Sequence, residues 1–418
     1  MKTLLKLAIR NALRNWKRNL LIGLLLLISS LVLIYYKTVI FSMKESLTNA
    51  VISNFSGHLQ IQRISDRSED PLSLDDNWDN LPANDVQQIQ NYILSGNIKN
   101  VKSIAPRVRL AALLSVDGIN NEGTFIYGVD TEVEFKNSKS IKALEGELLN
   151  ASTPNGILLE ASYAKKIKAK KGDQVVALLY GPEGYLIEEV FIVTGIIDFS
   201  GLSKWGFQVA YIPIAKAREL LSMEEGSVHE LVIYLNDKKW TRLAMNRLQS
   251  FLKEASLRDR VIPWYKIGNF IPNIVVILEF TFYAFFIIIF LVIIVLLINM
   301  VFLTISSRFR EIGTLRAIGA STAQTTFLYI LEVELVITFF TTIGAILGSF
   351  TSYLLSKRGM DAMFAYQEYA YGGSHLNVIF DPGIAVVVFF VYIGLGFLAA
   401  LIPSYYAGKT KPILMMKS

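Results

Sequence analysis

Four long apolar segments constrain the fold of this chain more than any other feature of its sequence. A helix needs about 20 predominantly apolar residues to cross the hydrocarbon core of a bilayer, and each segment reaches that length. Only 18% of the residues are charged, against about 25% in soluble proteins, which excludes an ordinary soluble enzyme. We predict four transmembrane helices, at residues 20–42, 271–305, 326–356 and 383–406.

The short segments that flank these helices predict their orientation. Residues 1–19 hold six basic residues and no acidic one, and the loop 306–325 and the tail 407–418 are also basic. Because basic flanks stay in the cytoplasm, we expect both termini there, with residues 43–270 and the loop 357–382 outside. The net charge of +6 then reflects topology and requires no nucleic acid. No small-residue cleavage site follows the first segment, so we expect a retained anchor and no signal peptide.

Residues 1–19 also have the pattern of an amphipathic helix. Ile9 and Trp16 share one helical stripe, and Lys6, Arg10 and Arg14 share another. Basic amphipathic helices of this kind lie in the headgroup region of a membrane. We therefore expect a cytoplasmic helix on the membrane surface, with a plain cytoplasmic flank as the alternative.

The segment 43–270 has the mixed composition of an α+β domain. Short runs rich in β-branched and aromatic residues predict strands at 58–62, 108–116, 124–129, 174–179, 188–197, 208–212 and 230–235. Helices are predicted at 83–95, 161–167, 214–221 and 240–255. The predicted fold class is an α-helical polytopic membrane protein with four transmembrane helices and a large α+β extracytoplasmic domain inserted between helices 1 and 2.

Residues that could carry chemistry are scarce. The chain has no cysteine, and its three histidines, His58, His229 and His375, lack the spacing of metal ligands. Residues 407–410 end like a phosphate-binding loop, but Pro403 stands where the first glycine belongs. We therefore expect no catalytic residue, no metal and no cofactor in this chain, and any ATP must bind to another chain.

The third predicted helix contains two notable features. Glu332 and Glu334 lie near its cytoplasmic start, where we expect them to extend toward the headgroups, because a carboxylate inside a membrane is costly. Gly344 and Gly348 form a small-xxx-small pattern, which predicts close helix packing.

The cytoplasmic loop reads REIGTLRAIGAS from Arg310 to Ser321. This sequence resembles the signature of ABC-transporter permeases of the MacB/LolE/FtsX type. Other segments resemble landmarks of the same family: 8–18, 57–61, 105–108, 128–130, 156–173 and 402–414. The resemblance implies one half of a Type VII ABC exporter. In that family two permeases pair, as a homo- or heterodimer, and two copies of a separate ATPase bind ATP and Mg²⁺.

In that family the segment between the second and third spans contacts the ATPase, and ATP-driven closure there rocks the helices and moves the outer domain. Carried over to this chain, the contact falls at about residues 309–321. The resemblance assigns coupling to the following residues: Arg310, Glu311, Ile312, Gly313, Leu315, Arg316, Ile318 and Gly319.

The length and layout of the chain most resemble LolC and LolE of the bacterial inner membrane, which extract lipoproteins and pass them to a periplasmic carrier. Carrier docking on this chain stays open, because the hairpin tip Gly181–Gly184 is short for a LolC-like hook. MacB-like peptide or antibiotic efflux and FtsX-like control of a cell-wall hydrolase stay open as alternatives. A cavity for acyl chains, next to membrane lipids, would be lined by Ile28, Leu31, Tyr35, Val39, Phe282, Phe285 and Phe286.

Overall fold

The computed structural model describes residues 2–14, 16–63, 79–116, 118, 121–137, 141–150, 152–181, 184–198, 208–267, 270–306 and 309–409. They form two compact units. The helical unit comprises Met1–Met43, Ile277–Met360 and Asn377–Ser418, and the sheet unit comprises Lys44–Val276 and Asp361–Leu376. The predicted tail 407–418 is described only to residue 409, so most of it lies outside these ranges.

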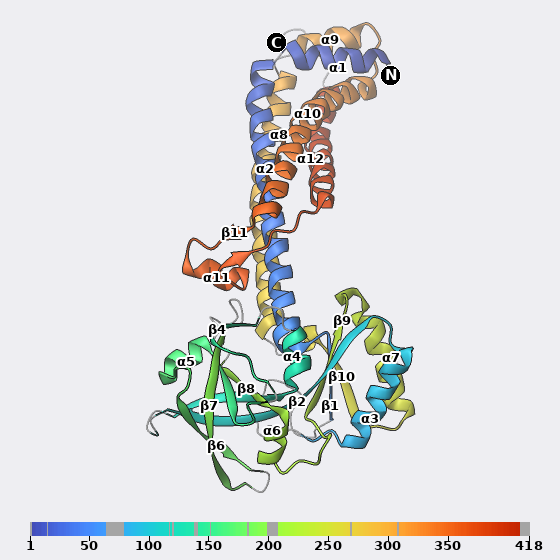
Figure 1. Ribbon diagram of the computed structural model, residues 1–418. Helices are drawn as coiled ribbons and strands as arrows, with labels where there is room; N and C mark the ends of the chain where they lie inside the picture. The colour runs from blue at the N-terminus through green and yellow to red at the C-terminus, as the bar shows by residue number, and fades with distance from the viewer. Residues whose placement is uncertain are drawn as a thin grey trace. The chain divides into compact units, whose positions relative to one another are not determined.

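Four long helices are apolar and long enough to cross a membrane (Figure 1). They are α2 (Trp16–Val51), α8 (Phe270–Ser306), α10 (Thr322–Arg358) and α12 (Pro382–Lys409). Among the described residues, the helical unit also has two shorter helices, α1 (Lys2–Arg14) and α9 (Phe309–Ala317). The predicted layout, four spans with a large domain between the first and second, is confirmed.

The first long helix continues well beyond the predicted end at residue 42. It runs to Val51 and passes into a π-helix, η1 (Ile52–Ser56). The apolar pattern stops near Phe41, but the polar residues that follow are compatible with a helix, so hydrophobicity alone misplaces its end. The chain leaves the helix at Gly57, whose φ of 58° suits glycine.

Glycines bring α10 close to α2. A Cβ on Gly344 would lie 1.9 Å from Oγ of Ser30, and one on Gly348 would lie 3.1 Å from Cβ of Ile34. Lipid provides no hydrophobic drive for helix association, so such close approach through small residues is how membrane helices gain packing energy.

Hydrogen bonds reinforce this packing inside the helical unit. Ser352 Oγ donates to Thr38 Oγ1 at 3.2 Å, and Tyr392 OH donates to Ser29 Oγ at 2.8 Å. Each bond satisfies polar groups that would otherwise face an apolar surrounding, and each joins α2 to another long helix.

The expected extension of Glu332 and Glu334 toward the headgroups is wrong. Glu332 is 3% exposed, and both carboxylate oxygens of Glu334 are buried with no hydrogen-bond partner among the described residues. Gly396 of α12 makes room for Glu334, because a Cβ there would lie 2.8 Å from Oε1. The two acids therefore turn into the protein.

Among the described residues, the main sheet of the sheet unit has ten strands, ordered β10-β1-β9-β2-β3-β8-β5-β7-β4, with β6 paired to both β2 and β7. The strands are β1 (Leu59–Arg63), β2 (Val101–Ser115), β3 (Glu122–Val129), β4 (Lys142–Gly146), β5 (Gly156–Glu160), β6 (Gln174–Tyr180), β7 (Leu186–Asp198), β8 (Val209–Pro213), β9 (Glu230–Leu235) and β10 (Asp259–Pro263).

Six of these strands close into a ring, β2-β3-β8-β5-β7-β6, because β6 pairs back to β2. β2 belongs to two parts of the sheet: Val101–Arg107 pairs with β9, and Ala112–Ser115 pairs with β6. One apolar core lies among the ring strands, α5 (Ala161–Ile167) and α6 (Ile214–Leu220).

A second apolar core lies between β1, β9, β10 and two helices, α3 (Ala83–Tyr92) and α7 (Thr241–Glu254). All seven predicted strands and four predicted helices of this domain are present. Sequence patterns missed β4, β5, β10 and the helix α4 (Thr131–Asn137). Each of the missed elements has five to seven residues.

A bulkier residue at Gly344 tests the α2–α10 packing. We expect Gly344→Leu to lower the stability of the full-length protein in detergent by about 1–3 kcal/mol, the usual cost of overpacking, measured by thermal unfolding. Gly394 of α12 is the matched control, because a Cβ there meets nothing within 4 Å. Equal losses in Gly344→Leu and Gly394→Leu would contradict the packing role.

Candidate functional site

The helix α9 ends in a tightly defined turn. Ala320 N donates to Leu315 O at 3.0 Å, and Gly319 N donates to Arg316 O at 3.1 Å. These two bonds form a Schellman motif, which places a positive φ at the residue after the helix. Gly319 fills that position with φ of 107°. A side chain there would be strained, so the glycine of the signature has a backbone role.

The next helix, α10, begins immediately after this turn with a capping box. Ser321 Oγ accepts from Gln324 N at 3.2 Å, and Gln324 Oε1 accepts from Ser321 N at 2.9 Å. Two donors of the new helix are thereby satisfied at its first turn. The corner between α9 and α10 is thus fixed by four hydrogen bonds over a few residues, and α9 should move together with α10.

The predicted coupling residues lie on or next to α9. Ile318 is 81% exposed, although it is apolar. Glu311 accepts two hydrogen bonds from Nη2 of Arg14, at 2.6 and 2.9 Å, which ties α9 to α1. Of the predicted set, Arg310, Glu311, Ile318 and Gly319 are exposed, Leu315 and Arg316 are half-buried, Gly313 is buried, and Ile312 lies within α9.

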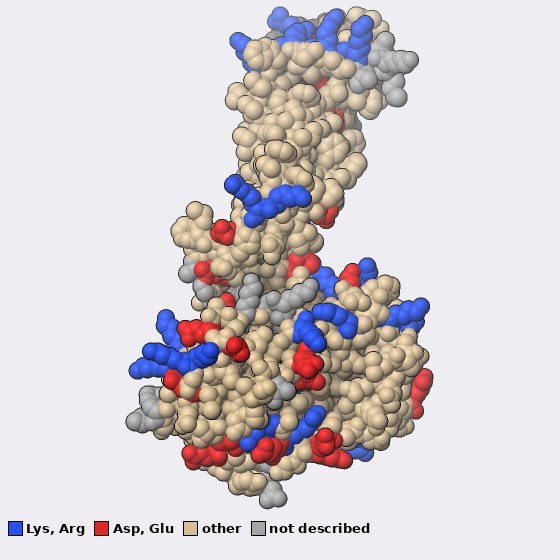
Figure 2. Space-filling model, in the orientation of Figure 1, with Lys and Arg blue, Asp and Glu red and all other residues tan. Residues whose placement is uncertain are grey.

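Basic side chains gather at the end of the helical unit that carries α1 and α9, whereas its flanks are almost free of charge (Figure 2). The exposed residues of this basic end include Lys6, Arg10, Arg14, Lys17 and Arg310. The surface is suited to acidic groups, whether on a protein or on lipid headgroups.

A second group of predicted residues lies between α2 and α8. The ring centroid of Tyr36 lies 4.6 Å from that of Phe285 and 5.9 Å from that of Phe282. Phe282 in turn stacks on Phe286 at 6.1 Å. The predicted residues Phe282, Phe285 and Phe286 therefore come together, but the aromatic side chain of α2 that meets them is Tyr36. Its neighbour Tyr35 was the predicted one.

Lys37 joins this aromatic group through its charge. Its Nζ lies 4.1 Å from the ring centroid of Phe282 and 5.6 Å from that of Tyr283, within the range of a cation–π interaction. On α2, the predicted Ile28 is exposed, and Leu31, Tyr35 and Val39 are half-buried. Their assignment to a cavity stays a prediction.

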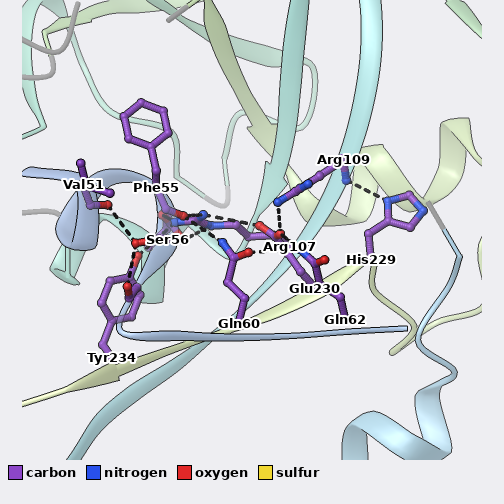
Figure 3. Close-up of polar contacts among 12 residues, drawn as sticks. Val51, Phe55, Ser56, Gln60, Gln62, Arg107, Arg109, His229, Glu230 and Tyr234 are labelled. Carbon is purple, nitrogen blue, oxygen red and sulfur yellow. Dashed lines mark hydrogen bonds and ion pairs between the residues drawn. The ribbon is translucent and has the colours of Figure 1, made fainter. Parts of the chain in front are cut away.

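The structure contains a polar cluster that the sequence patterns did not indicate (Figure 3). At its centre, Arg107 of β2 is 2% exposed, and its Nη2 donates to Glu134 Oε1 at 2.5 Å. The same nitrogen donates to Tyr234 OH at 3.0 Å, and Nη1 lies 3.5 Å from Glu230 Oε1. Arg109, two residues along β2, pairs with the other oxygen of Glu230. Two arginines and two glutamates therefore balance in charge.

Buried charges of this kind are costly unless they are paired, and the pairing here shifts proton affinities. Burial lowers the pKa of Arg107, but the nearby Glu134, Tyr234 and Glu230 outweigh that effect and raise the pKa above its usual range. Arg107 is therefore a permanent cation in the interior of the sheet unit.

This cation holds the end of the first long helix. Arg107 Nη1 donates to the carbonyl oxygen of Phe55 in η1, and Gln60 Nε2 donates to the same oxygen at 3.4 Å. Tyr234 OH donates to Ser53 O at 3.5 Å. The last carbonyls of a helix lack partners within it and carry partial negative charge. Arg107 supplies these carbonyls with a hydrogen-bond donor and with a positive charge, so a residue of the sheet caps the helix.

Two of the three histidines have structural roles in the same unit. His229 Nδ1 accepts from Arg109 N at 2.9 Å, and His58 Nδ1 accepts from Leu235 N at 3.0 Å. Burial, with a smaller effect of Arg109, lowers the pKa of His229 to about 4, and burial also lowers that of His58 to about 4. Both rings are therefore neutral acceptors that complete backbone hydrogen bonding.

Two family models match the chain. The one described as MacB-like periplasmic core domain covers residues 22–251, and the one described as FtsX-like permease C-terminal covers residues 283–412. The first of them alone spans more than half of the chain. The chain belongs to the MacB/FtsX/LolE type of ABC-transporter permease. Membership of this permease family implies an ABC ATPase as partner and a dimeric permease.

Solved outer domains are similar to part of the permease. The periplasmic region of MacB from Actinobacillus actinomycetemcomitans is 13% identical, with a TM-score of 0.34 over 51% of this chain and 92% of that chain. The extracellular domain of the ABC-type transporter YknZ from Gram-positive bacteria is 12% identical, with a TM-score of 0.34 over 49% of this chain and 98% of that chain. No curated protein matches the permease. Because both TM-scores are low, membership rests on the two family models.

Replacement of Arg107 tests the cluster. We expect Arg107→Met to destabilise the sheet unit by about 3–5 kcal/mol, because two buried glutamates lose their cation. Hydrogen exchange of the full-length permease in detergent should show lost protection at both β2 and η1. Lys166→Met is the control, since its pair with Glu122 at 2.6 Å is exposed and should contribute at most about 1 kcal/mol. Unchanged protection at η1 in Arg107→Met would contradict the capping role.

Proposed function

We propose that this permease transmits the ATP-driven motion of a separate ATPase to its outer domain, and that it extracts lipoproteins from the inner membrane for release to a periplasmic carrier. The observation that carries the first part is the geometry of α9. An exposed apolar residue, Ile318, follows α9 directly, and the fixed corner at Gly319–Ser321 joins α9 to α10. A displacement of α9 is thereby passed to a membrane-spanning helix.

The geometry of α2 supports transmission of motion to the sheet unit. This helix is continuous from the helical unit into the sheet unit, and Arg107 caps its extension η1. A tilt of α2 is therefore expected to exert a force on the sheet through η1. ATP and Mg²⁺ belong to the partner ATPase in this proposal, and the permease chain contributes no catalytic residue.

The cargo and the topology belong to the same proposal. The length and layout of the chain resemble those of the lipoprotein-releasing members, and the aromatic rings around Tyr36 and Phe285 offer apolar contacts to acyl chains, with the charge of Lys37 beside them. The basic end with α1 and α9 supports a cytoplasmic position for both termini. The sheet unit then lies in the periplasm.

The coupling role predicts a specific loss of binding. Ile318→Glu should weaken co-purification of the ATPase at least about tenfold, or about 1.4 kcal/mol, because it places a charge on an exposed apolar contact. Leu94→Glu is the matched control, since Leu94 is an exposed apolar residue of the sheet unit. Undiminished co-purification with Ile318→Glu would place the ATPase contact elsewhere.

The cargo is tested by purifying the permease complex from its native cell in mild detergent and identifying bound proteins by mass spectrometry. We expect an ATPase together with acylated lipoproteins, and fewer lipoproteins bound to Phe285→Glu than to the control Phe390→Glu, which changes an exposed position of α12. An ATPase with an adaptor or a hydrolase, and no lipoprotein, would replace the cargo assignment with efflux or hydrolase control. Absence of an ATPase would overturn the coupling assignment as well.

A further inference from the structure

The chain between α10 and α12 forms a small closed element, drawn in orange in Figure 1. Two short strands, β11 (Met360–Asp361) and β12 (His375–Leu376), pair at its base. His375 Nδ1 lies 2.6 Å from Asp361 Oδ1 across that base. The helix α11 (Ala365–Tyr371) lies between the strands. The element is therefore held as a unit and is more than a plain connection.

Three large side chains in and just before α11 are exposed. Met363 is 82% exposed and Phe364 is 58% exposed, and Tyr369 on the helix is 40% exposed. The backbone there is fixed, because Gln367 Oε1 accepts from Met363 N at 2.7 Å and from Phe364 N at 3.2 Å. Two large apolar side chains are thus presented outward by an ordered turn.

The opposite side of the element is attached to α2. Ser46 Oγ donates to Tyr371 O at 2.8 Å, and a Cβ on Gly372 would lie 3.0 Å from Cδ2 of Leu47. Ser46 follows Phe41, the last residue of the apolar run of α2, by five residues, which is about 7.5 Å along a helix. The attachment point therefore lies just past the apolar stretch of α2.

The helix that precedes the element in the chain ends in basic residues. Lys357 and Arg358 form the basic last turn of α10, and both are exposed. Basic residues at the end of a spanning helix extend to the lipid phosphates. Met363 follows Arg358 by five residues, a span of at most about 18 Å.

We propose that Met363, Phe364 and Tyr369 insert into the outer leaflet at the boundary between headgroups and acyl chains. The element is joined along the chain to two candidate spans, α10 before it and α12 after it. Aromatic residues favour this depth. A stable protein partner would need about 20–30 residues on each side, whereas α11 has seven. The element gives the chain a contact with lipid outside its four spans, whatever the cargo of the permease.

The chain has no cysteine, so a single introduced cysteine is the only position that a thiol-reactive label can modify. Single variants Met363→Cys and Phe364→Cys of the full-length permease carry a nitroxide label in nanodiscs of phosphatidylcholine and phosphatidylglycerol. Accessibility to oxygen, which concentrates in the bilayer, is compared with accessibility to a water-soluble nickel chelate. Leu94→Cys, exposed in the sheet unit, serves as the water control, and Phe390→Cys, exposed on α12, serves as the bilayer control.

We expect both labels at α11 to favour oxygen and to lie about 5–10 Å below the headgroups, the depth of interfacial helices. Labels that match Leu94→Cys would overturn the proposal, because the element would then lie in water. Labels shielded from both reagents would also overturn it, because protein would then cover the surface. Gel filtration of the labelled variants against the unlabelled chain verifies that each is folded.

Discussion

The interaction between Arg107 and the carbonyl of Phe55 organises the sheet unit. It occurs where β2 changes partner from β9 to the ring strands, so the guanidinium lies at the junction of two parts of the sheet. The arginine caps the long helix, neutralises Glu134 and contacts Glu230. A buried ion pair adds little stability compared with apolar packing, but loss of one partner is costly. The geometry of helix, ring and outer strands is thereby fixed together.

The helices of the helical unit need another source of packing energy, because apolar contact between helices gains no hydrophobic free energy in lipid. Its helices pack through glycines and through hydroxyl groups. Gly344 and Gly348 of α10 allow α2 to approach closely, and Ser29 Oγ accepts a hydrogen bond from Tyr392 OH. Glu334 also depends on a glycine, because the absence of a side chain at Gly396 leaves space for its carboxylate. These contacts depend on shape, so α10 and α2 are expected to move as one body.

Sequence patterns predicted the spans, because apolar length is a local property, and they predicted seven strands from short runs rich in β-branched and aromatic residues. They could not predict the Arg107 cluster. Its partners, Glu134 and Glu230, lie 27 and more than a hundred residues away along the chain. The burial of Arg107 and Arg109 is visible only after folding. Likewise, the predicted cavity included Tyr35 of α2, whereas helix phase turns Tyr36 toward α8.

Two local motifs support the proposed transmission of motion through this permease. At α9, two backbone bonds close the Schellman turn, and two bonds between side chains and backbone form the capping box that starts α10 directly after it. At η1, Arg107 holds α2 by a permanent charge in a medium of low dielectric, where screening is weak. Motion that passes through these two places in the proposal meets a hydrogen-bonded turn at one and a buried ion-pair cluster at the other.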